Sequence, residues 1–226
     1  MIIDPYSWRD AVIVDRIQES TEAVSLCIET DDDYVFFSGQ HAIVRVALPS
    51  GIKLIRQYSF ASSPISGEIW FTVVREPYGV VSGWLTNEAE IGESIEISQP
   101  FTGPLRQELP YKNVGMIAGG SGIVPIMSHI RSIRLQANQP NVHLLYSTKR
   151  DKECYIEELS SVYESETIDV VRSDVSGRFI TSAISILAEE SDALLLCGSH
   201  KFVNDISLQI KQIHPDLPIF TEAFSL

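Results

Sequence analysis

The side chains with the clearest chemical potential stand together in the run Arg56-Gln57-Tyr58-Ser59. The Arg56 guanidinium can bind a diphosphate through two parallel hydrogen bonds. The Tyr58 ring can lie flat against a planar ring system, and the Ser59 hydroxyl can hydrogen-bond the polar edge of that ring. These groups suit a flavin. The same residues also suit a surface strand that leads into a serine-rich turn.

A glycine-rich turn lies further along the chain. Residues 113–118 have the pattern of a buried strand, which continues into Gly119-Gly120-Ser121-Gly122 and then into an apolar, helix-like stretch. Glycines at such a turn let the backbone approach a dinucleotide pyrophosphate, and the amides at a helix start attract its charge. Pro125 fits the first helical turn, where its missing N–H is not needed. Tight turns use the same residues, but the two motifs together favour the flavin interpretation.

Composition limits the class of protein. The chain has 226 residues, enough for two domains of about 100 residues each. Its apolar fraction of 44% and charged fraction of 21% are those of an ordinary soluble globular protein. A net charge of −13 repels phosphate backbones and anionic lipids, so we expect no nucleic-acid partner and no membrane partner. No stretch resembles a membrane span or a secretory signal, which predicts a cytoplasmic location.

The three cysteines are widely separated. Cys27, Cys154 and Cys197 form no CxxC pair and show no metal-binding spacing with histidine, so we expect no metal site. A cluster held by four cysteines cannot be built from this chain alone. Any one-electron relay is therefore expected on a separate protein.

The hydrophobic pattern changes near the middle of the chain. Short β-rich runs with turn signals between them occupy residues 11–14, 23–28, 42–48 and 69–74. From residue 113 onward, strands alternate with helices expected near residues 153–163, 179–189 and 201–213. The sequence predicts an N-terminal antiparallel β-barrel, residues 1–106, followed by a doubly wound parallel α/β domain, residues 107–226.

Both motifs, in this order and with Cys197-Gly198 closing a later strand, resemble the ferredoxin–NADP reductase family of flavoproteins. The resemblance covers nearly the whole chain, and it is to family members without an iron–sulfur domain. It implies FAD as the bound cofactor and NADH or NADPH as the hydride donor. It also implies that a separate protein, such as a ferredoxin, a flavodoxin or an oxygenase component, accepts the electrons.

The resemblance assigns roles to individual residues. It implies that three segments hold the flavin, namely Arg56, Gln57, Tyr58 and Ser59; Thr72, Val73 and Val74; and Gly79, Val80, Val81 and Ser82. It implies that the dinucleotide is held by Gly120, Ser121, Gly122, Pro125, Cys197 and Gly198. Ser59, Cys197 and Glu222 are the expected catalytic residues, and Phe224 is expected beside the flavin. Ser199 is expected to cap a helix.

The chain also departs from the family pattern. Phe224 stands where plant-type members end in tyrosine, and Ser225 and Leu226 follow it. Lys149 or Arg150 could meet a 2′-phosphate, yet cations in a loop are usually only solvated, so the choice between NADH and NADPH stays open.

Three functions are compatible with these residues. The first is a reductase with bound FAD and a protein acceptor, and the Gly79–Ser82 segment favours it because a tight turn before a helix suits a diphosphate. The second is an NAD(P)H-dependent flavin or ferric reductase that uses free flavin. The third is a non-catalytic, flavin-bearing electron-transfer subunit.

Overall fold

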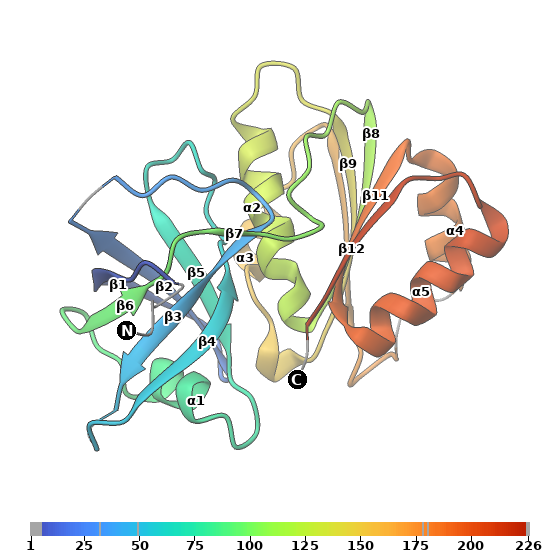
Figure 1. The fold of residues 1–226 in the computed structure, drawn as a ribbon. Helices are drawn as coiled ribbons and strands as arrows, with labels where there is room; N and C mark the ends of the chain where they lie inside the picture. Colours follow the sequence, from blue (N-terminus) through green and yellow to red (C-terminus); the bar gives the residue numbers. More distant parts are fainter. Residues whose placement is uncertain (1–5, 32, 49, 178, 180, 225–226) are drawn as a thin grey trace.

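Two sheets of different type form the two halves of the molecule (Figure 1). The computed structural model describes residues 6–31, 33–48, 50–177, 179 and 181–224. The first sheet contains β1 (Arg9–Ser20), β2 (Ala23–Thr30), β3 (Gln40–Ala47), β4 (Lys53–Ser59), β5 (Ile69–Val74), β6 (Ser94–Ile97) and β7 (Phe101–Thr102). All pairings in it are antiparallel, in the order β4-β3-β6-β1-β2-β5, with β7 beside β3.

The first sheet closes into a barrel. A bridge between Phe60 and Phe71 joins the ends of the path, β4 and β5. Alternation of buried and less buried residues along β3 places Ala42, Val44 and Val46 in the barrel core, as expected for a strand with one face inward. Helix α1 (Val80–Asn87) follows β5 and packs its apolar side into the same core. The expected antiparallel barrel is confirmed.

The second sheet is parallel, in the order β10-β9-β8-β11-β12. Its elements are β8 (Asn113–Gly119), η1 (Gly120–Gly122), α2 (Ile123–Arg134), β9 (Asn141–Thr148), η2 (Arg150–Lys152), α3 (Ile156–Ser160), β10 (Glu166–Arg172), α4 (Thr181–Glu190), β11 (Ala193–Ser199), α5 (His200–Ile213) and β12 (Ile219–Phe224). Helices α2 and α3 cover the face toward the barrel, and α4 and α5 cover the far face (Figure 1). The doubly wound α/β domain is confirmed.

Two elements differ from the expectation. Strand β6 completes the barrel between β1 and β3, although the pattern does not single it out. The helix expected near residues 153–163 forms only over α3. It cannot begin before Ile156, because Tyr155 has a φ of +60°, which a right-handed helix does not allow. The domain boundary after residue 106 lies in the connection between β7 and β8 and stays a prediction. Among the described residues, none of the helices has the length and apolar character needed to span a bilayer.

Candidate active site

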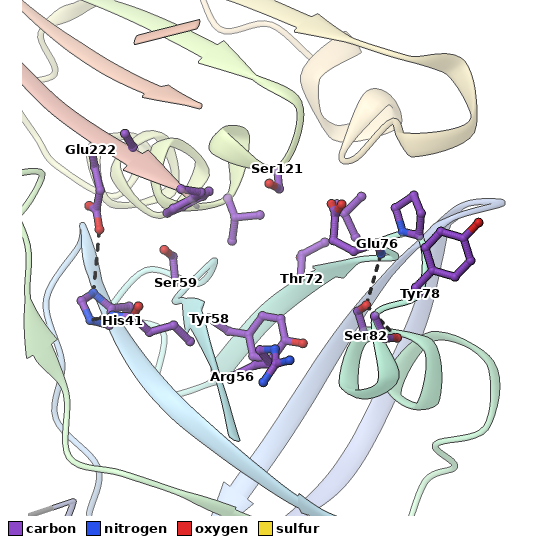
Figure 2. A pocket seen from close by; sticks show the side chains of 17 residues that line it. His41, Arg56, Tyr58, Ser59, Thr72, Glu76, Tyr78, Ser82, Ser121 and Glu222 are labelled. Carbon is purple, nitrogen blue, oxygen red and sulfur yellow. Dashed lines mark hydrogen bonds and ion pairs between the residues drawn. The ribbon is translucent and has the colours of Figure 1, made fainter. Parts of the chain in front are cut away.

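A cleft of about 440 Å³ lies where the barrel meets the α/β domain (Figure 2). Its barrel wall comes from β3, β4, β5 and the loop before α1, and its opposite wall comes from η1, α2 and β12. Predicted site residues that line it are Arg56, Gln57, Tyr58, Ser59, Thr72, Val74, Gly79, Ser82, Ser121, Glu222 and Phe224. The two sequence motifs therefore face one another across a single cavity.

The barrel wall presents the aromatic and cationic groups. Tyr58 stacks on Phe71 with ring centroids 5.7 Å apart and an angle of 17° between the planes. Burial raises the pKa of Tyr58, so its phenol stays neutral. The exposed Arg56 guanidinium donates to the carbonyl of Ile55 at 2.7 Å, and no described carboxylate pairs with it. An aromatic platform and a cation free of carboxylates thus lie on the same wall.

The loop before α1 is closed by Ser82. The Ser82 hydroxyl donates to the carbonyl of Gly79 at 3.3 Å and accepts from the amide of Glu76 at 3.2 Å. A Cβ on Gly79 would lie 2.4 Å from the Ser82 oxygen, so glycine is needed here for close approach. No side chain caps the N-terminus of α1. The amides of this first turn are therefore suited to an anion, while the serine organises the loop.

The glycine turn is packed tightly against β11. Gly120 has a φ of +54°, which favours glycine. A Cβ on Gly122 would lie 2.4 Å from the carbonyl oxygen of Cys197, a backbone atom that cannot move alone. Pro125 lies in the first turn of α2, and Ser121 faces the cleft (Figure 2). Close packing on β11 explains Gly122, and the positive φ explains Gly120.

Cys197 does not line the cleft in this structure. Its side chain is fully buried, and burial raises the pKa of the thiol well above its usual value. Phe224 lines the cleft and packs against the core cluster that contains Cys197. The role of Cys197 beside the dinucleotide therefore stays a prediction. Ser199 accepts a hydrogen bond from the amide of Phe202, which confirms its role as a helix cap.

Glu222 and His41 face one another across the seam (Figure 2). His41 Nδ1 lies 3.8 Å from Glu222 Oε1. The Gln57 amide nitrogen donates to Nε2 of His41, which leaves the ring proton on Nδ1, the side toward Glu222. Burial lowers the pKa of His41 and raises the pKa of Glu222 to about 7. The linker backbone closes over the carboxylate, because a Cβ on Gly103 would lie 2.9 Å from Glu222 Oε1.

Several predicted residues contribute no side chain to the cleft wall. They are Val73, Val80, Val81, Gly120, Gly122, Pro125, Cys197 and Gly198. Of these, Val73 and Val81 are buried in the barrel core. Only the backbone of Val73 and Val81 could therefore contact a ligand. Ser225 and Leu226 lie outside the described residues.

Sequence reasoning missed six residues that line the cleft: His41, Glu76, Pro77, Tyr78, Val124 and Ala223. Tyr78 has a φ of +64° and a fully exposed ring, and its position directly before Gly79 could have drawn attention to it. His41 pairs with Ser59 across β3 and β4, a register that no short motif shows.

Two buried atoms of the cleft support an FAD site. His41 Nδ1 and Glu222 Oε2 have no hydrogen-bond partner among the described residues. Buried polar atoms normally find partners, so these two atoms fit a site that a polar ligand completes. Together with the stacked ring of Tyr58, the uncapped α1 and Arg56, the residues fit the aromatic ring and the diphosphate of FAD.

Comparison with known proteins agrees with this geometry. Residues 11–105, which span the barrel, match the oxidoreductase FAD-binding domain family. The 2-halobenzoate 1,2-dioxygenase electron transfer component of Burkholderia cepacia is 34% identical over 140 residues, covering 61% of this chain and 40% of that protein. A flavohemoprotein of Oceanobacillus iheyensis is 30% identical over 147 residues, covering 62% of this chain and 36% of that protein.

A solved structure shares the complete two-domain fold. The ferredoxin NADP+ reductase of Neisseria gonorrhoeae, with bound FAD and NADP, superposes with a TM-score of 0.82 at 19% identity, over 96% of this chain and 98% of that chain. By contrast, the chain spans less than half the length of the two curated relatives.

Proposed function

We propose that this chain, which belongs to the ferredoxin–NADP reductase family, is an NAD(P)H-dependent FAD oxidoreductase that passes electrons to a separate acceptor protein. The main support is the single cleft in which the barrel wall with Arg56, Tyr58 and Ser59 faces the turn with Ser121. Bound FAD would supply the redox chemistry, since it exchanges a hydride with a nicotinamide and can release electrons singly.

The residues of the chain bind and orient. Arg56 and the first-turn amides of α1 would hold the diphosphate, and Tyr58 would support one face of the flavin ring. Ser59 would hydrogen-bond the polar edge of the ring. Glu222 can hold or release a proton near neutral pH, because burial brings its pKa to about 7.

The acceptor is proposed to be a ferredoxin, a flavodoxin or an oxygenase component. The B. cepacia relative is named as an electron transfer component of a dioxygenase, which supports the last of these. The chain carries a net charge of −13, so an acidic acceptor would need a local basic surface at which to dock.

The test is anaerobic bleaching of the flavin. The purified protein should be yellow, and addition of NADH or NADPH without oxygen should remove the absorbance of oxidised flavin. Absence of bleaching with both donors would refute the proposal. Comparing both donors over a panel of carrier proteins would identify the nucleotide preference and the acceptor.

Retention of the cofactor separates this function from a reductase that uses free flavin. The cleft continues past the Tyr58 region to Pro77, Tyr78 and Gly79, which leaves a wall for the adenosine half of FAD. We therefore expect the yellow colour to elute with the protein on gel filtration. Turnover of an artificial acceptor with NAD(P)H would distinguish an enzyme from a non-catalytic electron-transfer subunit.

A further inference from the structure

A line of hydrogen bonds crosses from the α/β domain into the barrel wall at Tyr155. The Tyr155 side chain is only 3% exposed, and its hydroxyl bonds to Oγ1 of Thr72 on β5. Thr72 Oγ1 lies 2.6 Å from Ser25 Oγ, and Ser25 donates to Glu19 Oε1 at 2.6 Å. Thr72 also lines the cleft. The line therefore connects the second domain to a strand of the candidate flavin site.

The chemistry of the groups fixes which one donates in each hydrogen bond of this line. A carboxylate only accepts, so the single proton of Ser25 goes to Glu19. Thr72 must then donate to Ser25, and Tyr155 must donate to Thr72. Burial raises the pKa of Tyr155, which keeps its phenol proton in place. Tyr155 is thus the terminal donor of a series in which each hydroxyl donates to the next, and the last hydroxyl donates to Glu19.

Glu19 also holds the backbone of the same tyrosine. The amide of Tyr155 donates to Glu19 Oε2 at 2.8 Å, where Tyr155 adopts its φ of +60°. The Arg131 guanidinium lies 4.9 Å from the centre of the Tyr155 ring and donates to the carbonyl of Ala61 at 2.9 Å. Tyr155 is therefore held by its amide, its ring and its hydroxyl at the junction of the two domains.

The preceding residues add further contacts to the barrel. The Asp151 carbonyl accepts from the amide of Glu22 at 2.8 Å and from the Ser20 hydroxyl at 2.9 Å. Lys152 Nζ donates to the carbonyl of Arg75, just after β5, at 2.9 Å. The segment of residues 151–155 therefore binds the barrel at both the β1–β2 turn and the end of β5.

This segment starts at the carboxyl end of β9, the edge at which a doubly wound sheet receives its ligands. We propose that Tyr155 is a positioning residue. Through the line of hydrogen bonds to Glu19, it holds the nucleotide-binding edge of the α/β domain at a set distance from β5. This role rests on the proposed function, because the geometry that it maintains is that between nicotinamide and flavin.

The test uses Tyr155→Phe, which removes only the terminal donor. Flavin reduction is followed by anaerobic rapid mixing over a range of NADH or NADPH concentrations. The limiting rate should fall roughly 10- to 100-fold, because small misalignment of reacting groups has effects of this size, while FAD content stays unchanged. Glu19→Gln should act in the same direction, because the glutamine carbonyl oxygen can accept from only one of the Tyr155 amide and the Ser25 hydroxyl, and its NH2 nitrogen can accept from neither.

The matched control is Tyr34→Phe. It also removes a tyrosine hydroxyl, which is half-buried and donates to the carbonyl of Ser98 at 2.6 Å, but this bond lies wholly within the barrel. Tyr34→Phe should keep the wild-type limiting rate. Equal rates in Tyr155→Phe and wild type would refute the positioning role, and so would equal losses in both tyrosine variants.

A second measurement does not depend on turnover. Amide hydrogen exchange should quicken in residues 69–74 and 149–155 of Tyr155→Phe and stay unchanged there in Tyr34→Phe. Unchanged exchange in both segments would also refute the proposal. A wild-type protein that is not bleached by either nucleotide would instead overturn the proposed function.

Discussion

His41 Nδ1 and Glu222 Oε1 lie 3.8 Å apart, so the barrel and the last strand of the α/β domain present an imidazole and a carboxyl group to each other. Burial pushes both groups toward their neutral forms, lowering the pKa of His41 and raising that of Glu222. The pair is therefore less an ion pair than a contact between two polar groups that burial shifts toward their neutral forms.

The first prediction concerns stability and pH. The pKa of Glu222 rises from 4.5 to about 7 on folding, so over this range the folded chain keeps a proton that the unfolded chain has released. Its contribution to the free energy of unfolding must fall as the pH rises. His41 acts in the opposite direction below its unfolded pKa of 6.5, because its pKa is lowered on folding.

Comparison with Glu222→Gln isolates the carboxyl group, since His41 titrates in both proteins. Urea unfolding should show the wild type losing stability relative to the variant from about pH 5 to about pH 7, with a constant difference above about pH 8. A difference that does not vary with pH would mean that Glu222 has an ordinary pKa.

The second prediction concerns Tyr58. Tyr58→Ala should lose FAD on gel filtration, because the stacked ring is removed, whereas Tyr58→Phe should retain it. The ratio of flavin to protein absorbance measures both. Retention of FAD by Tyr58→Ala would show that the flavin ring lies elsewhere.

The third prediction compares two glycines. In Gly122→Ala the new Cβ would lie 2.4 Å from the Cys197 carbonyl oxygen, so the turn must shift, and we expect a loss of about 1–3 kcal/mol in the free energy of unfolding. Gly83→Ala is the control, because nothing lies within 4 Å of its new Cβ.

Gly83 lies inside α1, where alanine is favoured over glycine by roughly 0.5–1 kcal/mol, so this variant should be more stable than the wild type. Thermal unfolding of both proteins provides the comparison. If Gly122→Ala were as stable as Gly83→Ala, the close contact with β11 would be wrong.

The fourth prediction concerns access to Cys197. Cys197 and Glu222 are paired across β11 and β12, and Phe224 is two residues beyond Glu222, so all three side chains share the sheet face toward the barrel. Phe224→Ala should speed alkylation of Cys197, as followed by peptide mass spectrometry. Cys154, buried elsewhere in the same core cluster, should remain slow in both proteins.

Local patterns along the chain were sufficient for the domain types and for the choice of candidate site residues. The change from short β runs to alternating strands and helices predicted both sheets, and residues 56–59 of the first motif and Ser121 of the second line the cleft. Such signals depend on neighbours in sequence, because a strand period, a glycine turn or a helix cap is set by nearby backbone geometry. Glu222 was expected in the site from the family resemblance alone, and it lines the cleft from β12.

Pairings between distant segments came only from the tertiary structure. His41 meets Ser59 through strand register and Glu222 through domain packing. The serine-rich turn after β4 also contacts the α/β domain, since the Ser62 carbonyl accepts a hydrogen bond from the Ser128 hydroxyl of α2 at 2.7 Å. The amino-acid order determined which groups this protein carries and which elements hold them. The packing of the barrel on the α/β domain decided which of these groups meet, because contacts across that seam join residues with no local relation in the chain.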